Sequence, residues 1–146
     1  MATIKSFTDL SQSKVLAEFL PIESSDMFCA DVFDKEKESH SYNFHILSTW
    51  GCNTFEELKD RENKLVHFIP CWSLAALLQV LPLGIYDEFD NCDYELEIDM
   101  IDKMPRYIRL GDIYHSKFPY DFEKDTLLDN VVESIIWLND NNYFEL

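Results

Sequence analysis

The feature that most constrains this fold is a stretch of eight residues in which acidic and apolar side chains alternate without interruption. The acidic positions are Asp93, Glu95, Glu97 and Asp99, and the apolar positions are Tyr94, Leu96, Ile98 and Met100. Successive side chains of a strand point to opposite faces of the sheet, so this period predicts a β-strand with one buried and one solvated face.

Weaker patterns indicate the other elements. Helices are expected over about 8–20, with Thr8 as the N-cap, and over 54–63, 73–81 and 126–139. Further strands are expected over 27–33, 42–47, 65–69, 106–110 and 113–115, with the first two forming a hairpin, whereas residues 83–92 are expected to form a loop.

This order of elements predicts the α+β class. Hairpin-length connections outnumber β-α crossovers, so we expect an antiparallel sheet of about five short strands packed with three to four helices. The chain has 146 residues and neither an internal repeat nor a linker that would divide it, which predicts a single globular domain over 1–146.

The charge balance restricts the partners. The net charge is −16, from 28 acidic and 12 basic residues, which argues against direct binding to a nucleic-acid phosphate backbone. No apolar run is long enough to cross a bilayer, so no membrane partner is expected. The first twenty residues lack the features of a secretory signal, so the expected location is cytoplasmic.

Metal and cofactor chemistry find little support in the residue spacing. The cysteines lie far apart and include no C-x-x-C pair: Cys29, Cys52, Cys71 and Cys92. We therefore expect free thiols and no metal site, and give little weight to the isolated pair of His67 and Cys71. The chain has only three glycines and contains neither a P-loop nor a dinucleotide-binding fingerprint, so we expect no cofactor.

No residue pattern singles out a catalytic set, and the chain is expected to be a non-enzymatic protein. One enzymatic alternative stays open, a small hydrolase whose site is assembled from dispersed histidines and carboxylates. The histidines that could serve it are His45, His67 and His115.

The acidic strand lies within a longer acidic block. Asp87 to Asp102 holds eight carboxylates and no basic residue in 16 positions. On one strand face, Asp93, Glu95, Glu97 and Asp99 would stand about 6.8 Å apart, a spacing comparable with that of consecutive phosphates. Such a ladder would suit an inhibitor that mimics nucleic acid. The alternative is a solvated sheet face whose carboxylates pair with Arg106 and Arg109 on the next strand.

Trp137 is the second candidate contact residue. The apolar residues of the last helix fill one half of its circumference, and Trp137 falls in the other half. A tryptophan there could anchor a partner or a second copy of the chain in a homodimer. Alternatively, the tail at Tyr143 and Phe144 folds back and covers it.

Three segments carry a resemblance. The proline-bracketed block from Ile69 to Pro82, the opening Ile4 to Pro21 and the closing Glu133 to Leu138 resemble segments of small acidic proteins from phages, prophages and mobile elements of gut bacteria. That family has no assigned activity, so the resemblance implies a genomic setting and no functional residues. The leading hypothesis is an interaction or accessory factor of a phage or mobile element that binds a host protein.

Overall fold

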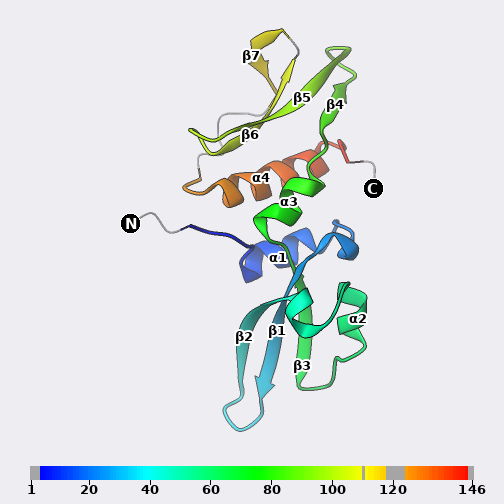
Figure 1. The fold of residues 1–146 in the computed structure, drawn as a ribbon, viewed down its shortest axis with the longest axis vertical. Helices are drawn as coiled ribbons and strands as arrows, with labels where there is room; N and C mark the ends of the chain where they lie inside the picture. Colours follow the sequence, from blue (N-terminus) through cyan, green and yellow to red (C-terminus); the bar gives the residue numbers. More distant parts are fainter. Residues whose placement is uncertain (1–3, 110, 118–123, 145–146) are drawn as a thin grey trace. The chain divides into compact units, whose positions relative to one another are not determined.

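The computed structural model describes residues 4–109, 111–117 and 124–144, with the backbone alone for 112–116 (Figure 1). Its helices are α1 (Leu10–Leu16), α2 (Phe55–Lys59), α3 (Leu74–Val80) and α4 (Leu127–Asp140), with 3-10 turns η1 (Ile22–Ser24) and η2 (Leu47–Trp50). Its strands are β1 (Met27–Asp34), β2 (Ser39–Ile46), β3 (Val66–Cys71), β4 (Gly84–Asp87), β5 (Cys92–Asp99), β6 (Met104–Arg109) and β7 (Asp112–Ser116).

The strands form two antiparallel sheets in two compact units. The N-terminal unit, Ser6–Ala76, contains the sheet β2-β1-β3, and the C-terminal unit, Met1–Lys5 with Leu77–Leu146, contains the sheet β4-β5-β6-β7. The α+β class and the antiparallel pairing are confirmed, whereas the expected single sheet is replaced by two. The single domain over 1–146 stays a prediction. Within the described residues, every helix is too short or too polar to cross a membrane.

In the N-terminal unit, β1 is the central strand and is covered on both faces. One face packs in a cluster that also holds residues of η2, α2 and β3: Phe28, Ala30, Leu47, Cys52, Phe55, Leu58 and Phe68. The other face packs with β3 and with Leu10 of α1, through Met27, Cys29, Ile69 and Cys71. This two-sided burial is the reason why the start of β1 reads as a continuous apolar run.

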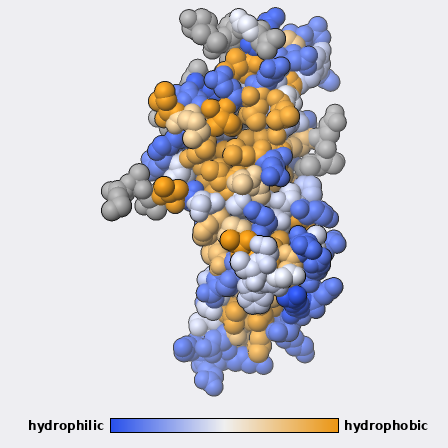
Figure 2. Space-filling view, in the orientation of Figure 1, coloured by the Kyte–Doolittle hydropathy of each residue, from blue (hydrophilic) through white to orange (hydrophobic). Residues whose placement is uncertain are grey.

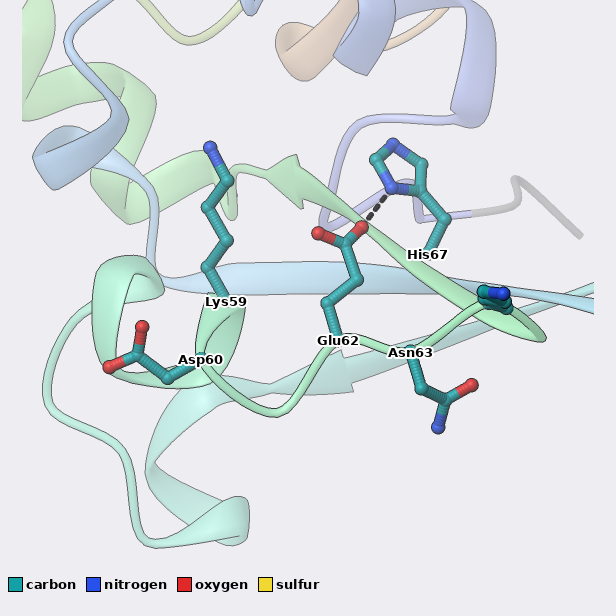
Figure 3. Close-up of a pocket in the computed structure, with 6 residues that line it drawn as sticks. Lys59, Asp60, Glu62, Asn63 and His67 are labelled. Carbon is teal, nitrogen blue, oxygen red and sulfur yellow. Dashed lines mark hydrogen bonds and ion pairs between the residues drawn. The ribbon is translucent and has the colours of Figure 1, made fainter.

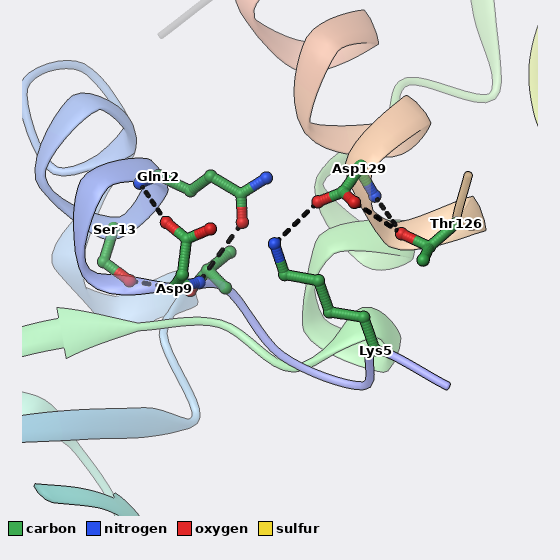
Figure 4. Close-up of polar contacts among 7 residues, drawn as sticks. Lys5, Asp9, Gln12, Ser13, Thr126 and Asp129 are labelled. Atoms are coloured by element: carbon green, nitrogen blue, oxygen red, sulfur yellow. Dashed lines mark hydrogen bonds and ion pairs between the residues drawn. The ribbon is translucent and has the colours of Figure 1, made fainter. Parts of the chain in front are cut away.

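The start of α1 differs from the prediction by one residue. Asp9, not Thr8, is the N-cap, and Asp9 and Gln12 form a reciprocal capping box (Figure 4). Thr8 is fully buried, and its Oγ1 lies 2.7 Å from Ser13 Oγ and accepts a 3.1 Å hydrogen bond from the backbone N–H of Trp72. Thr8 therefore joins the N-terminal segment to the end of β3 and is not available as a cap.

In the C-terminal unit, α4 packs against β6. The helix begins close to the predicted 126, with Thr126 as its N-cap, and it buries one face: Leu128, Asn130, Val131, Val132, Ser134, Ile135 and Leu138. Tyr107 of β6 is fully buried, and its hydroxyl donates a 2.6 Å hydrogen bond to the carbonyl of Pro82. At the first turn of α4, Lys5 Nζ lies 2.7 Å from Asp129 Oδ1 (Figure 4).

The expected loop over 83–92 is wrong, because its first part forms β4. Gly84 to Asp87 pair with Cys92 to Glu95 as an antiparallel hairpin. The sequence obscures this strand because its inward-facing positions are Ile85 and a buried aspartate, Asp87, instead of two apolar residues.

The buried amide of Asn130 yields a test of the C-terminal unit. Its Nδ2 donates to the carbonyls of Lys103, at 2.7 Å, and Lys124, at 3.2 Å, and its Oδ1 accepts from the N–H of Lys124 at 3.0 Å. Asn130→Ala leaves these backbone groups without their partner, so we expect the free energy of unfolding in urea to fall by about 1–3 kcal/mol.

Asn139→Ala on the same helix is the matched control, because the structure gives the Asn139 side chain no hydrogen bond to a described residue. An equal loss of stability in both variants would contradict the role of the Asn130 amide.

Candidate partner-binding surface

The alternation predicted for β5 is present in the structure. Asp93, Glu95 and Glu97 are exposed, while Tyr94 on the opposite face is only 3% exposed and Leu96 is half-buried. Among the described residues, these three carboxylates form no ion pair and no side-chain hydrogen bond. We call Asp93, Glu95 and Glu97 the acidic strand face.

Asp99, the fourth residue of the predicted ladder, has a different environment. Its Oδ1 accepts the backbone N–H groups of Ile101, at 2.9 Å, and Asp102, at 3.0 Å, and its Oδ2 lies 3.1 Å from Arg106 Nη1. The hydrogen bond from Asp102, then that from Ile101 and the charge of Arg106, hold the pKa of Asp99 below its ordinary value, against the effect of burial. Asp99 therefore shapes the turn between β5 and β6.

The turn between β4 and β5 also gathers carboxylates around a single cation. Lys117, which follows β7, forms an ion pair with Asp87 Oδ2 and lies 3.4 Å from Asp90 Oδ2. The Tyr94 hydroxyl donates a 2.8 Å hydrogen bond to the same oxygen of Asp90. Asp87 is 5% exposed, so this ion pair is largely removed from water.

The pKa values of this cluster follow from those contacts. The hydrogen bond from Lys117 lowers the pKa of Asp87, and the hydrogen bond to Asp87 raises the pKa of Lys117. Burial, with the hydrogen bond to Asp90, raises the pKa of Tyr94. At neutral pH the pair is therefore charged and Tyr94 is a neutral hydrogen-bond donor.

The carboxylates of the acidic block thus fall into two groups, those that form ion pairs with described residues and those that do not. Four of its carboxylates pair with Lys117 or Arg106: Asp87, Asp90, Asp99 and Asp102. The remaining four form no ion pair with a described residue, and three of those make up the acidic strand face. The expected pairing with Arg106 is present at Asp99, whereas Arg109 lies opposite Tyr94 and pairs with no carboxylate that the structure describes.

A groove runs beside the acidic strand face, along the edge strand β4. Asp93 and Glu95 line it together with Leu83, Gly84 and Tyr86. Gly84 stands opposite Glu95 in the sheet, and a Cβ added to it would lie 3.3 Å from the carbonyl oxygen of Tyr94. The absence of a side chain there leaves the flank of Glu95 open. No pattern in the sequence predicts this groove, because residues 83–92, which include β4, are expected to form a loop.

Trp137 is half-buried and not free on the helix surface. Its ring stacks on that of Tyr143 with 5.5 Å between centroids, and the backbone N–H of Tyr143 bonds to the carbonyl of Leu138 at 2.9 Å. The tail thus covers Trp137, as in the second of the two alternatives. Its role as an anchor for a partner or for a homodimer stays a prediction.

Of the histidines of the hydrolase alternative, His45 and His67 have described side chains, and these two have different neighbours. His45 packs against the rings of Phe28 and Trp50, with 5.3 Å between centroids in both pairs. His115 lies in β7, and its side chain is outside the described residues. His40, a further histidine of β2, lies 2.6 Å from Asp31 Oδ1 through its Nδ1.

His67 lines an open pocket on the N-terminal unit (Figure 3). Its Nδ1 contacts Glu62 Oε1, which also accepts the N–H of Phe68 at 3.2 Å. The other side chains that line the pocket belong to lysine, aspartate and asparagine, so none of them offers a hydroxyl or thiol nucleophile. The His67 side chain is 66% exposed, and water is not excluded from it.

All four cysteines are free thiols, and Cys29, Cys52 and Cys71 are buried. Burial raises the pKa of the Cys71 thiol to about 12, so it is not a thiolate at neutral pH. Among the residues that the structure describes, no group of three or more metal-binding side chains is gathered in one place.

Comparison of the chain with protein-family models, with curated proteins and with solved structures finds no match.

The Asp87–Lys117 pair predicts a pH dependence. The pKa of Asp87 is lower in the folded chain than its ordinary 3.8, so the stability it contributes is present above that value and is lost as the pH falls through the folded pKa. The pKa of Lys117 is raised above its ordinary 10.5, so its contribution is present below that value and is lost at higher pH. We expect Asp87→Asn to have a lower Tm than the wild-type protein at pH 7. This difference in Tm should disappear as the pH falls through the folded pKa of Asp87.

Thermal unfolding of the wild-type protein and of Asp87→Asn between about pH 2 and pH 8 measures this effect, since this pH range spans the titration of aspartate. Asp93→Asn is the control, because Asp93 is exposed and has no described ion pair. A difference for Asp87→Asn that stays constant down to pH 2 would argue against the ion pair as its cause.

Proposed function

We propose that this protein is a non-enzymatic interaction protein that binds a basic partner protein through the acidic strand face. The observation that supports this is the row of three exposed carboxylates, Asp93, Glu95 and Glu97, without a described counter-ion. The groove lined by Gly84 and Tyr86 beside them offers an apolar contact next to the charge.

The charge on this face has a cost for the isolated protein. Carboxylates about 6.8 Å apart repel one another by about 0.6 kcal/mol per adjacent pair in water, and more at a protein surface. Two cations of this unit, Lys117 and Arg106, pair with carboxylates of the two turns instead. A basic partner would remove this repulsion, which is why we favour binding over a purely solvated surface.

The setting in a phage or mobile element, with a host protein as the partner, is part of this proposal and rests on the sequence resemblance. Mimicry of nucleic acid is its sharper form, in which the basic partner is itself a nucleic-acid-binding protein. The strand spacing of the three carboxylates, close to that of phosphates, is what favours this form.

An enzymatic role has weaker support. His67 with Glu62 is the arrangement closest to a catalytic pair, yet its pocket is open to water and its lining offers no hydroxyl or thiol nucleophile. We therefore do not propose hydrolysis.

Neutralising the acidic strand face tests the proposal. In Asp93→Asn/Glu95→Gln/Glu97→Gln, we expect loss of at least about nine-tenths of the partner that the wild-type protein captures from host lysate at low salt, because the attraction is electrostatic. Capture by the wild-type protein should also fall steeply as salt is raised.

The matched control is Glu18→Gln/Glu36→Gln/Glu38→Gln, which removes the same charge from exposed positions of the N-terminal unit. Equal capture by both triple variants would reject the acidic strand face as the binding site. Displacement of the captured partner by duplex DNA, but not by an uncharged polymer, would support mimicry.

A further inference from the structure

The strand β2 is an open edge of the N-terminal sheet. It runs for eight residues, and every one pairs in an unbroken antiparallel register with β1. In the sheet order β2-β1-β3, no described strand pairs with its other side (Figure 1). Residues 39–43 of β2 are exposed, with Tyr42 at 43%. An open edge presents unpaired N–H and C=O groups that another strand can bind.

The opposite edge of the same sheet, at β3, is obstructed at its C-terminal end. Pro70 of β3 has no N–H to donate, and the end of β3 continues into a bridge between Phe7 and Ser73. The backbone N–H of Thr8 donates to the carbonyl of Trp72 at 2.9 Å, which occupies this edge further. Among the described strands of this sheet, β2 therefore has the longer uninterrupted edge for a new strand.

The composition of β2 lacks the usual protection of an edge strand. Its sequence, Ser-His-Ser-Tyr-Asn-Phe-His-Ile, has no charged residue, no proline and no glycine, although 27% of the chain is charged. Natural edges are commonly guarded by lysine, proline or a bulge, and β2 has none of these.

We propose that β2 pairs with β2 of a second copy of this chain, antiparallel and around a two-fold axis, to form one continuous six-stranded sheet. If the two-fold axis passes beside Tyr42, Tyr42 of one copy lies opposite Tyr42 of the other. His40 of each copy then lies opposite Phe44 of the other. Aromatic side chains would then meet on one face and small polar ones on the other, which are favourable cross-strand pairs.

Charge explains both the choice of a second copy and the orientation. Each copy carries −16, so two copies repel, and the repulsion is least where they meet at an uncharged segment. The charged run Asp34–Glu38 lies at the tip of the β1–β2 hairpin, a hydrophilic cluster at the lower end of Figure 2. Antiparallel pairing keeps the two tips roughly 27 Å apart, the length of eight strand residues and beyond the Debye length at about 0.1 M salt.

The assembly ends at two copies. An isologous contact uses the same surface on both chains, so the β2 edges of two copies satisfy each other and leave none for a third copy. This inference concerns the N-terminal unit and uses no residue of the acidic strand face. The inference can therefore hold even if the proposed function is rejected.

Sedimentation velocity of the purified full chain tests the inference. We expect a monomer–dimer equilibrium whose dimer becomes at least tenfold tighter between about 0.05 and 0.5 M NaCl, since salt screens the repulsion between copies. Tyr42→Glu should weaken the dimer at least tenfold. Leu65→Glu, which adds the same charge at a side chain 42% exposed, should change it less than twofold.

Cross-linking gives a second measurement that does not depend on Tyr42→Glu folding well. Paired residues of antiparallel strands have Cα atoms about 4.5–5.5 Å apart, which a disulfide can span. In a Cys92→Ser background, which removes the one cysteine that is not buried, Tyr42→Cys should form a disulfide-linked dimer under mild oxidation, and Leu65→Cys should not.

Any of four results would overturn the inference. Three of them are a wild-type chain that stays monomeric up to about 1 mM at both salt concentrations, a dimer that Tyr42→Glu leaves intact, and cross-linking of Leu65→Cys as fast as that of Tyr42→Cys. A monomer that instead adds an extended segment of another protein to β2 would also overturn it.

Discussion

The C-terminal sheet depends on two cations, one at each end of its acidic strand β5. Lys117 holds Asp87 and Asp90 at the turn that precedes β5, and Arg106 holds Asp99 and Asp102 at the turn that follows it. A four-stranded sheet with this many carboxylates would otherwise carry strong repulsion at the two turns that flank β5. By neutralising both turns, these cations let the hairpins close and leave the middle of the strand charged.

The two ends are not equally strong. Asp87 is almost fully buried, so removal of Lys117 would leave a carboxylate in a poorly solvated position, which is far more costly than loss of a surface pair. Asp102 is 57% exposed, and water can replace Arg106 there. We therefore expect the contact of Lys117 with the β4–β5 turn, a contact between residues distant in sequence, to contribute most to the stability of this sheet.

The elements that the sequence predicted well are those whose signals are local. The strand over 93–99 follows from its own alternation. The start of α4 after its cap Thr126 is also local, because a side-chain cap needs only the next three residues. The elements that it predicted poorly depend on distant residues. Asp87 makes β4 look like a loop until Lys117 is placed beside it, and Thr8 looks like a cap until the backbone of Trp72 occupies its hydroxyl. The division into two sheets has the same origin, because no local pattern shows that β3 pairs with β1.

The two proposed surfaces differ in chemistry in a way that lets one chain use both. The acidic strand face attracts opposite charge and repels another copy, while β2 has no charged residue and can be shared by two copies. Because the surfaces belong to different units and have no residue in common, substitutions in one should leave the other nearly unchanged. A dimer through β2 would then carry two acidic faces. Against a basic partner with repeated sites, the second face would bind at the high effective concentration set by the first, so a weak single contact would become a strong double one wherever the spacing of the partner's sites allows it.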